Sequence, residues 1–237
     1  MHDLSTTTAV ILAGGLGTRL RTVVAEKPKA LAPILGRPFL AFLFDRLIAA
    51  GLQRAVICTG HMADQIRDEF KSQYRSLKVE YSQETQPLGT AGAIKLAQPL
   101  IGDTTSLVLN GDSVCDVDFR AFGAFHAAKK GPVSMVLVEV PDASRFGRVD
   151  IADDDALLAY HEKSPEVRPG WINSGIYLLE PNVVESIPAG KAVSIERDIF
   201  PQWIGKGLYG FRCRGRFIDI GTPESYRQAE QFFGEKA

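Results

Sequence analysis

The sequence predicts a doubly wound α/β fold, in which helices cover both faces of a sheet built around parallel strands. Short apolar runs alternate with helix-like segments through about the first 128 residues. Their spacing of roughly 25 residues is typical of βαβ units. The first apolar run, residues 9–13, stops at a glycine loop, which indicates a buried parallel strand that ends there.

The first half of the chain supplies the parallel strands of this prediction. The first helix follows Pro38, carries apolar residues at helical spacing, and ends at Gly51. The predicted strands of this half are 9–13, 55–58, 79–82 and 106–109. Its predicted helices are 39–50, 63–70 and about 90–97.

The second half is richer in strands. The predicted strands are 133–140, 148–151, 157–161 and 172–179, and the predicted helices are 181–187, about 195–204 and 223–233. No linker rich in Pro, Gly or Ser interrupts the sequence. We therefore expect one α/β domain over residues 1–237, whose second half adds strands and covers the carboxyl edge of the first.

Composition excludes several classes of protein. The 27 Lys and Arg against 28 Asp and Glu give a net charge of −1, which argues against a general nucleic-acid binder but not against a pocket for one nucleotide. Cys58, Cys115 and Cys213 are too few and too widely spaced for a disulfide framework or a zinc site. Residues 1–8 do not resemble a signal peptide, and no apolar run approaches the ~20 residues of a membrane span. We therefore expect a cytoplasmic protein without a membrane partner.

The loop after the first strand, Gly14-Gly15-Leu16-Gly17-Thr18-Arg19, has the composition of a phosphate-binding turn. Its glycines let the backbone approach a ligand and direct several N–H groups at it. The dinucleotide pattern fails because Leu20 stands where a third glycine is needed, and a P-loop fails because Gly207 follows Gly205-Lys206.

Basic residues follow this loop closely. Arg19, Arg21, Lys27 and Lys29 lie within about 15 residues, and cations beside a glycine loop suit a polyphosphate whose charge rises at the leaving group during transfer. For Arg21 and Lys27, a solvated surface charge is the alternative interpretation.

Taken together, segments 14–20, 27–29 and 32–34 resemble the signature of sugar-1-phosphate nucleotidylyltransferases. Residues 23–26 and 30–31 depart from it, because members usually carry a further Thr and often Pro-Leu there. With residues 36–40, the pattern is most similar to D-glycero-α-D-manno-heptose-1-phosphate guanylyltransferases, and the resemblance runs from about residue 9 to 233. It implies a Rossmann-like (GT-A-like) nucleotidyltransferase, a three-layer α/β/α sandwich with a mixed, mainly parallel central sheet. Residues 8–128 would be the nucleotide-binding half and about 129–233 the sugar-phosphate-binding half.

The resemblance implies an enzyme that joins a sugar 1-phosphate and an NTP to give an NDP-sugar and pyrophosphate. GTP with a heptose 1-phosphate, giving GDP-heptose for a surface polysaccharide (capsule, S-layer or LPS), is the leading expectation. Mannose-1-phosphate guanylyl transfer follows, and hexose-1-phosphate uridylyl or thymidylyl transfer is third. A non-catalytic homologue that only binds nucleotide sugar is the alternative of a different class, and it would be expected to lack Lys29 or a metal-binding Asp. We expect a monomer or a homodimer.

Two aspartates are candidates for a metal site. Asp112 follows the strand 106–109, at the strand end where ligands sit in open α/β sheets, although an Asp there can also cap a turn. Asp219 lies between apolar residues and needs a cation or hydrogen-bond donors. One Mg²⁺ shared by both, with Mn²⁺ as a substitute, meets these needs, and the family uses the matching positions in this way.

The remaining site residues are implied by the resemblance alone. Arg19 would hold the leaving pyrophosphate, Lys29 would stabilise charge on the α-phosphoryl group, and Lys163 would align the sugar phosphate; with Asp112 they form the catalytic set. The nucleotide-binding positions are Leu12, Ala13, Gly14, Gly15, Gly17, Thr18, Arg19, Glu84, Gly89, Thr90 and Asp112. The sugar-phosphate-binding positions are Gly147, Glu162, Lys163, Asn173 and Glu196.

The identity of the base rests on Glu84. Guanine presents two donors, N1–H and the N2 amino group, on its Watson–Crick edge, and an ionised carboxylate accepts from both. Uracil and thymine present one N–H between two carbonyls, so a carboxylate faces repelling oxygens. The sequence therefore predicts GTP in preference to UTP or dTTP. The alternative is a solvated Glu84 in a loop before a helix that starts at Thr90.

Overall fold

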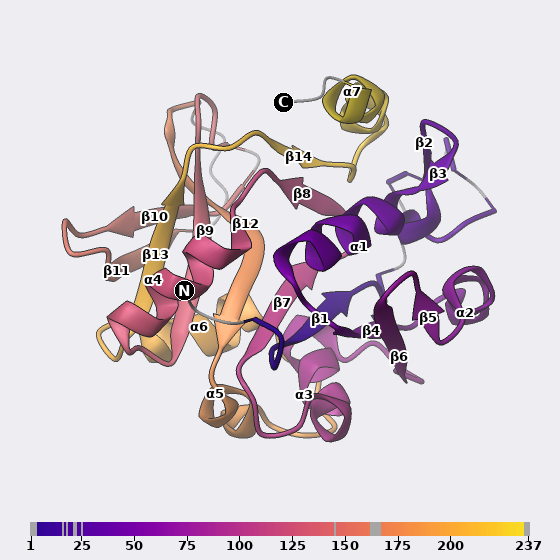
Figure 1. The fold of residues 1–237 in the computed structure, drawn as a ribbon. Coiled ribbons are helices and arrows are strands. Elements are labelled where there is room, and N and C mark those ends of the chain that lie inside the picture. Colours follow the sequence, from indigo (N-terminus) through magenta and orange to yellow (C-terminus); the bar gives the residue numbers. More distant parts are fainter. Residues whose placement is uncertain are drawn as a thin grey trace.

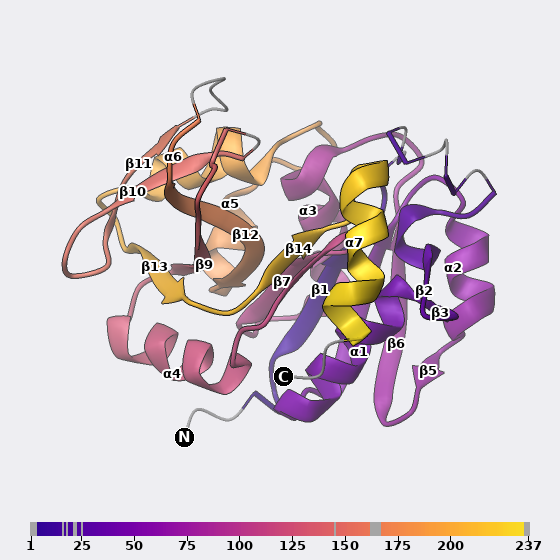
Figure 2. The same cartoon turned by 90° about the horizontal axis from the view of Figure 1, so that it is seen from above.

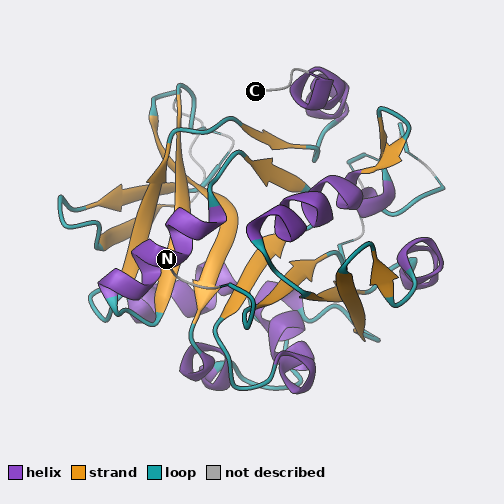
Figure 3. Ribbon diagram, viewed as in Figure 1, coloured by secondary structure: helices purple, strands orange, loops and turns teal. Residues whose placement is uncertain are grey.

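The computed structural model describes residues 4–15, 17, 19–20, 23–24, 26–144, 146–161 and 167–234. Its centre is a ten-stranded mixed sheet that runs through the molecule as one band (Figure 1, Figure 3). Along one path the strands follow the order β11-β10-β12-β7-β1-β4-β6-β5, and β9 and β13 branch from β12.

Four parallel strands form one part of this sheet. They are β1 (Thr8–Leu12), β4 (Arg54–Thr59), β6 (Leu77–Gln83) and β7 (Ser106–Asn110). Val10 pairs with Val56 on one side and with Val108 on the other, and all three side chains are fully buried. Burial on both faces explains why β1, β4 and β7 are nearly continuous apolar runs, whereas β6 alternates between buried and more exposed residues.

Antiparallel strands extend the sheet beyond β7. The central one is β12 (Gly170–Leu179), which pairs with β7 in the register Leu179 to Ser106 and Ile176 to Leu109. The other antiparallel strands are β9 (Val133–Val140), β10 (Arg148–Ile151) and β11 (Leu157–His161), and β13 (Leu208–Cys213) pairs parallel with β9. The register of β12 against β9 shifts between Asn173 and Tyr177, where Gly175 takes a φ of 78°. The strands of the second half therefore join the same sheet as those of the first.

Helices cover both faces of the sheet and give the expected three layers (Figure 2). One face carries α1 (Phe39–Ala50), α2 (Ala63–Phe70), α4 (Phe119–Lys129) and α7 (Pro223–Gly234). The other carries α3 (Gly89–Ile101), α5 (Pro181–Ser186) and α6 (Phe200–Trp203). Neighbouring residues of β1 alternate between the two cores, with Ile11 in the first and Val10 in the second. Phe233 of α7 stacks on Phe42 of α1 with ring centroids 4.1 Å apart, which fixes the last helix on the first core.

The helices differ from the sequence prediction in three places. Helix α4 was not predicted, although the Asp118 side chain caps it by accepting from the N–H groups of Arg120 and Ala121. Helix α3 continues past Pro99 to Ile101 instead of ending near 97. The segment predicted as one helix at 195–204 is a π-helical turn, Ile195–Ile199, followed by α6, and Pro201 near the start of α6 has no N–H for a continuous helix.

Short elements complete the chain. They are the 3₁₀ turn Lys29–Leu31 and the strands β2 (Pro33–Ile34), β3 (Arg37–Pro38), β5 (Gln73–Tyr74), β8 (Ser113–Cys115) and β14 (Phe217–Asp219). Strands β8 and β14 pair as a separate two-stranded sheet that the sequence did not predict. In the part of the chain that the structure describes, no helix is long and apolar enough to cross a bilayer.

Candidate functional site

The carboxyl ends of the parallel strands bring the predicted nucleotide-binding segments together. The N–H of Ala13, after β1, donates to the Cys58 carbonyl of β4 at 2.9 Å, and the N–H of Gly111, after β7, donates to the Leu12 carbonyl at 2.9 Å. The N–H of Glu84, after β6, donates to the Thr59 carbonyl at 2.9 Å. The loops after β1, β6 and β7 therefore start at one edge of the sheet, where ligands of such folds bind.

At this edge Lys29 and Asp112 form an ion pair with 2.6 Å between Nζ and Oδ2. The Lys29 side chain is 12% exposed, and the Asp112 side chain is 38% exposed. Gly17 has a φ of 59°, and a Cβ placed on it would lie 3.6 Å from Lys29 Cβ, so the glycine loop rests against this lysine. Two of the predicted catalytic residues are thus in direct contact, although 83 positions separate them.

Asp219 reaches the same place through β14. It pairs with Ser113 of β8, and the N–H of Ile220 donates to the Asp112 carbonyl at 2.9 Å. A Cβ on Gly221 would stand 3.1 Å from Lys29 Nζ and would also contact Asp219 Oδ1. Both predicted metal-binding aspartates therefore flank one lysine.

This donor set fits a hard divalent cation. Mg²⁺ is commonly held by one or two carboxylates, with phosphate oxygens and water filling the other positions. Asp112 and Asp219 supply the carboxylates, and among the described residues no group of three or more His, Cys, Asp or Glu side chains is placed to hold a metal on its own. The arrangement thus leaves room for phosphate ligands, and the Lys29 ammonium neutralises Asp112 in the free protein.

The Glu84 carboxylate packs closely against Gly14 and Gly60. Its Oε2 accepts from the Leu88 N–H at 2.9 Å, and a Cβ on Gly14 or on Gly60 would stand 2.8 or 2.9 Å from its Oε1. Gly14 was predicted as a nucleotide-binding position, whereas Gly60, the residue after β4, was not. Any larger side chain at either glycine would displace the carboxylate.

The segment after Glu84 packs against residues 191–193. The N–H of Val193 donates to the Leu88 carbonyl at 2.8 Å, and a Cβ on Gly89 would stand 2.6 Å from the Val193 carbonyl oxygen. Gly89, with a φ of 69°, therefore serves this close chain crossing. Thr90 Oγ1 accepts from the Ile195 N–H at 2.8 Å. These bonds join the predicted nucleotide side to the predicted sugar side.

On the sugar side, Asn173 and Glu196 meet around a buried tyrosine. Asn173 Nδ2 donates to Tyr177 Oη at 2.7 Å and to Glu196 Oε1 at 3.4 Å, and its Oδ1 accepts from the Gly175 N–H at 2.8 Å. Burial raises the pKa of Tyr177 well above its ordinary value, and the Glu196 charge adds to this, so the tyrosine stays a neutral phenol. Tyr177 was missed by the sequence analysis because a buried aromatic in a strand looks like core.

Gly147, another predicted sugar-side position, lies just before β10. A Cβ on Gly147 would stand 2.6 Å from Tyr160 Oη, so only glycine fits under this ring. His161 Nε2 contacts Asp150 Oδ2 at 2.6 Å on the neighbouring strand. Arg19 is exposed. The predicted positions Thr18, Glu162 and Lys163, with Leu16 and Arg21 of the loop argument, lie outside the described residues.

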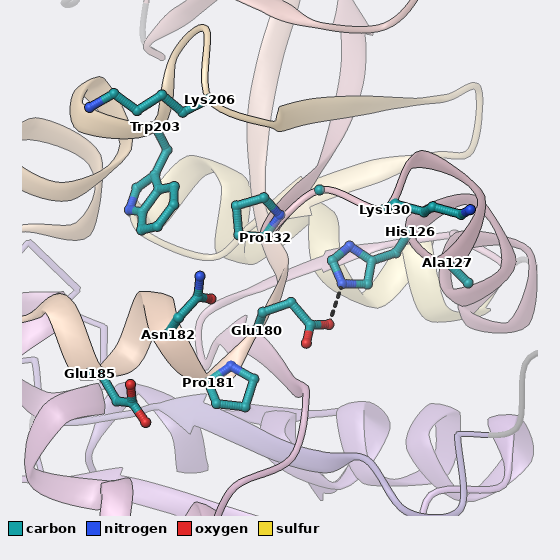
Figure 4. Close-up of a pocket in the computed structure, with 11 residues that line it drawn as sticks. His126, Ala127, Lys130, Pro132, Glu180, Pro181, Asn182, Glu185, Trp203 and Lys206 are labelled. Atoms are coloured by element: carbon teal, nitrogen blue, oxygen red, sulfur yellow. Dashed lines mark hydrogen bonds and ion pairs between the residues drawn. The ribbon is translucent and has the colours of Figure 1, made fainter.

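A separate pocket of about 870 Å³ lies at the opposite ends of the central strands (Figure 4). Its lining includes Glu180, which follows β12 and so lies near the start of β7, away from Asp112. Trp203 and Asn182 face each other across it, and His126 bonds to Glu180 at 2.9 Å between Nε2 and Oε1. None of the predicted site residues lines this pocket.

Comparison with known proteins agrees with the geometry at the strand ends. The profile of the nucleotidyl transferase family matches residues 8–236. The chain is 36% identical over 224 residues to the D-glycero-alpha-D-manno-heptose 1-phosphate guanylyltransferase of Aneurinibacillus thermoaerophilus, covering 94% of this chain and 96% of the relative. It is 36% identical over 222 residues to the mannose-1-phosphate guanylyltransferase of Mycobacterium tuberculosis, covering 92% of this chain and 62% of that protein's length.

Solved structures agree with the fold. HddC from Yersinia pseudotuberculosis superimposes with a TM-score of 0.85 at 38% identity, covering 96% of this chain and 99% of that one. The same protein complexed with GMP-PN gives a TM-score of 0.83 at 37% identity. Because the family match spans nearly all described elements, from β1 to α7, the chain belongs to the nucleotidyl transferase family.

Proposed function

We propose that this enzyme transfers the guanylyl group of GTP to D-glycero-α-D-manno-heptose 1-phosphate, giving GDP-heptose and pyrophosphate. The observation that carries the transfer chemistry is the convergence of Lys29, Asp112 and Asp219 at the carboxyl edge of the sheet. The heptose guanylyltransferase relatives and the GMP-PN complex of HddC support the choice of substrates. The product serves a surface polysaccharide, and the enzyme works in the cytoplasm, where nucleotide and sugar phosphates are made.

In the proposed mechanism the substrate supplies its own nucleophile. An oxygen of the sugar phosphate attacks the α-phosphorus of GTP in line, so the protein contributes positioning and charge stabilisation. Lys29, now paired with Asp112, moves to the α-phosphoryl oxygens as their charge grows. Arg19 holds the leaving pyrophosphate, and Lys163 aligns the sugar phosphate.

Asp112 and Asp219 would hold Mg²⁺, with Mn²⁺ as a substitute. When bound, the cation neutralises phosphate charge and polarises the reacting phosphoryl group. The two carboxylates are held in place by backbone pairing between β8 and β14, so their spacing is preset. Lys29 is paired with Asp112 in the free protein, so nucleotide phosphates, by giving the lysine a new partner, would free this carboxylate to hold the cation.

The base is read by Glu84. Its carboxylate is oriented by the Leu88 N–H, and each carboxylate oxygen retains a further lone pair for the N1–H and N2 amino group of guanine. Gly14 and Gly60 have no side chains, so the Glu84 carboxylate packs directly against them.

Changing Glu84 to Gln is expected to erode the preference for GTP, because the amide replaces one acceptor by a donor. A bidentate polar contact to a base discriminates by about 1–3 kcal/mol in comparable readout. The measurement is kcat/KM for GTP and for UTP in wild type and Glu84→Gln, with exposed Glu69→Gln on α2 as the matched control. An unchanged GTP/UTP ratio in Glu84→Gln would show that backbone groups read the base instead.

Sugar hydroxyls would be bound by Asn173 and Glu196, which Tyr177 holds together. Gly147 packs directly against the Tyr160 ring on the same side. Mannose 1-phosphate is the second candidate acceptor. The observation that supports it is the 36% identity to the mycobacterial mannose-1-phosphate guanylyltransferase.

A matrix of four NTPs against a panel of sugar 1-phosphates, followed by pyrophosphate release, tests the proposal. We expect the highest kcat/KM for GTP with the heptose 1-phosphate. A higher value for mannose 1-phosphate selects the second candidate, and a wild type that prefers UTP or dTTP defeats the guanylyl assignment.

A further inference from the structure

Cys115 and Cys213 are 98 positions apart in the sequence, yet their Sγ atoms lie 3.7 Å apart. Cys115 ends β8 and Cys213 ends β13, and their exposed fractions are 2% and 7%. Both are free thiols. At this separation the two sulfurs are in van der Waals contact, so an oxidant can join them by a single S–S bond.

The surroundings of the two sulfurs are asymmetric. Cys213 Sγ accepts from the Gly215 N–H at 3.3 Å and from the Cys115 thiol, and its own thiol donates to the Asp116 carbonyl at 3.7 Å. The Arg46 guanidinium, held on the Cys115 carbonyl at 2.9 Å, adds positive charge nearby.

These contacts divide the reactivity between the two thiols. The Cys115 hydrogen bond, followed by the Gly215 N–H and the Arg46 charge, lowers the pKa of Cys213 to about 6 despite its burial. The same hydrogen bond, together with burial, raises the pKa of Cys115. Asp116 and Arg216, which pair at 2.8 Å, complete the charged groups around the sulfurs. Cys213 is therefore the attacking thiolate and Cys115 the resolving thiol, the two roles that disulfide formation by peroxide requires.

The third cysteine provides a natural contrast. Burial raises the pKa of Cys58 to about 12, and its thiol donates to the Ala93 carbonyl at 3.6 Å. A buried thiol of this kind is inert toward oxidants.

We propose that Cys213 and Cys115 form a peroxide-responsive modification site, in which hydroperoxide oxidises the pair to a disulfide that lowers transferase activity. The Cys213 thiolate attacks one oxygen of hydrogen peroxide; the O–O bond breaks, hydroxide leaves, and sulfenic acid forms. The Cys115 thiol then attacks the Cys213 sulfur, the S–O bond breaks, and water leaves. One peroxide accepts two electrons from the two thiols, and the products are the disulfide, one water and one hydroxide, which becomes a second water when it takes up the proton that the Cys213 thiol lost on ionising.

The link to activity runs through β8. A disulfide bond is about 2.05 Å long, so the two sulfurs must approach by about 1.7 Å. Cys115 lies three residues after Asp112, and β8 pairs with the strand that carries Asp219. A displacement of about 1 Å near a reacting centre can cost up to ~10² in rate. The inference adds regulation to the proposed function.

The test treats the full chain with hydrogen peroxide and follows free thiols, intact mass and pyrophosphate release. In wild type we expect two of the three thiols to disappear, a cross-linked peptide joining Cys115 and Cys213, and an activity loss of about tenfold or more that dithiothreitol reverses. Cys58→Ser is the matched control and should behave as wild type. Cys115→Ser should stop at a sulfenic acid that dimedone traps on residue 213.

Cys213→Ser and Cys213→Ala should keep their activity under peroxide and react at least about tenfold more slowly at Cys115. Two variants are used so that a folding defect in one, seen by circular dichroism, does not decide the result. The proposal is overturned if wild type keeps all three thiols, if the disulfide forms with unchanged activity, or if the Cys213 variants lose activity as wild type does. The transferase activity of the unoxidised wild type tests the proposed function by itself. If that activity is normal, a negative peroxide result counts only against the regulatory proposal.

Discussion

Replacing Asp112 or Asp219 by Asn is expected to lower turnover by about 10³-fold while leaving the fold intact. An amide is neutral and offers a single acceptor oxygen, so it holds a divalent cation poorly, and a metal contributes several kcal/mol to such a transition state. Asp112 is 38% exposed on its side chain, and the backbone pairing of β8 with β14 does not depend on either carboxylate. The isosteric change therefore removes charge with little loss of packing.

Steady-state rates across a Mg²⁺ titration measure this effect, together with direct metal titration by calorimetry. EDTA should stop the wild type, and Mg²⁺ or Mn²⁺ should restore it. Exposed Asp103→Asn, in the turn after α3, is the matched control. A normal Mg²⁺ titration in either site variant would show that the aspartate is structural.

Lys29→Ala is expected to lower kcat far more than it raises the KM for nucleotide. The proposed contact to the α-phosphoryl group strengthens as charge develops, and removal of one such donor costs about 10²–10³ in rate. The same change leaves Asp112 without its 2.6 Å partner, so the free variant should bind Mn²⁺ more tightly than wild type does.

Lys27→Ala, an exposed neighbour, is the control for Lys29→Ala. Full activity in Lys29→Ala contradicts the catalytic role. Unchanged Mn²⁺ affinity in the free variant contradicts the competition between lysine and metal, because that competition needs no substrate.

The fold could be predicted largely because its strands are buried on both faces. Runs such as residues 9–13 and 133–140 have no alternation and few other interpretations, and β9 occupies the predicted range. Helix α4 was missed because Gly123 and His126 weaken the amphipathic pattern of its sequence. In the structure both residues are nevertheless buried with the apolar face of the helix. Strand β14 has three residues, and both β13 and β14 depend on partners far along the chain, so neither was predicted.

The position of a candidate site residue could be predicted from the sequence where that residue directly follows a strand. Asp112 follows from the rule that ligands bind at carboxyl ends, and its contact with Lys29 agrees with that rule. Gly60 was not found because its role depends on Glu84, which is 24 positions away on another strand end, and Tyr177 was not found because its contact with Asn173, on the same strand, cannot be read from the sequence. The pair Cys115 and Cys213 was invisible for the same reason, since wide spacing in sequence conceals a contact made by sheet pairing.

The place of β12 beside β7 has a consequence for synthesis of the chain. Until residues 176–179 emerge from the ribosome, β7 has β1 on one side and an open row of backbone N–H and C=O groups on the other. Such an apolar edge recruits strands from other nascent chains. Roughly 70 residues separate the two pairing segments, and at bacterial and eukaryotic elongation rates they take about 4–14 s to make. During that interval the nascent nucleotide half is the species that a holdase chaperone must protect.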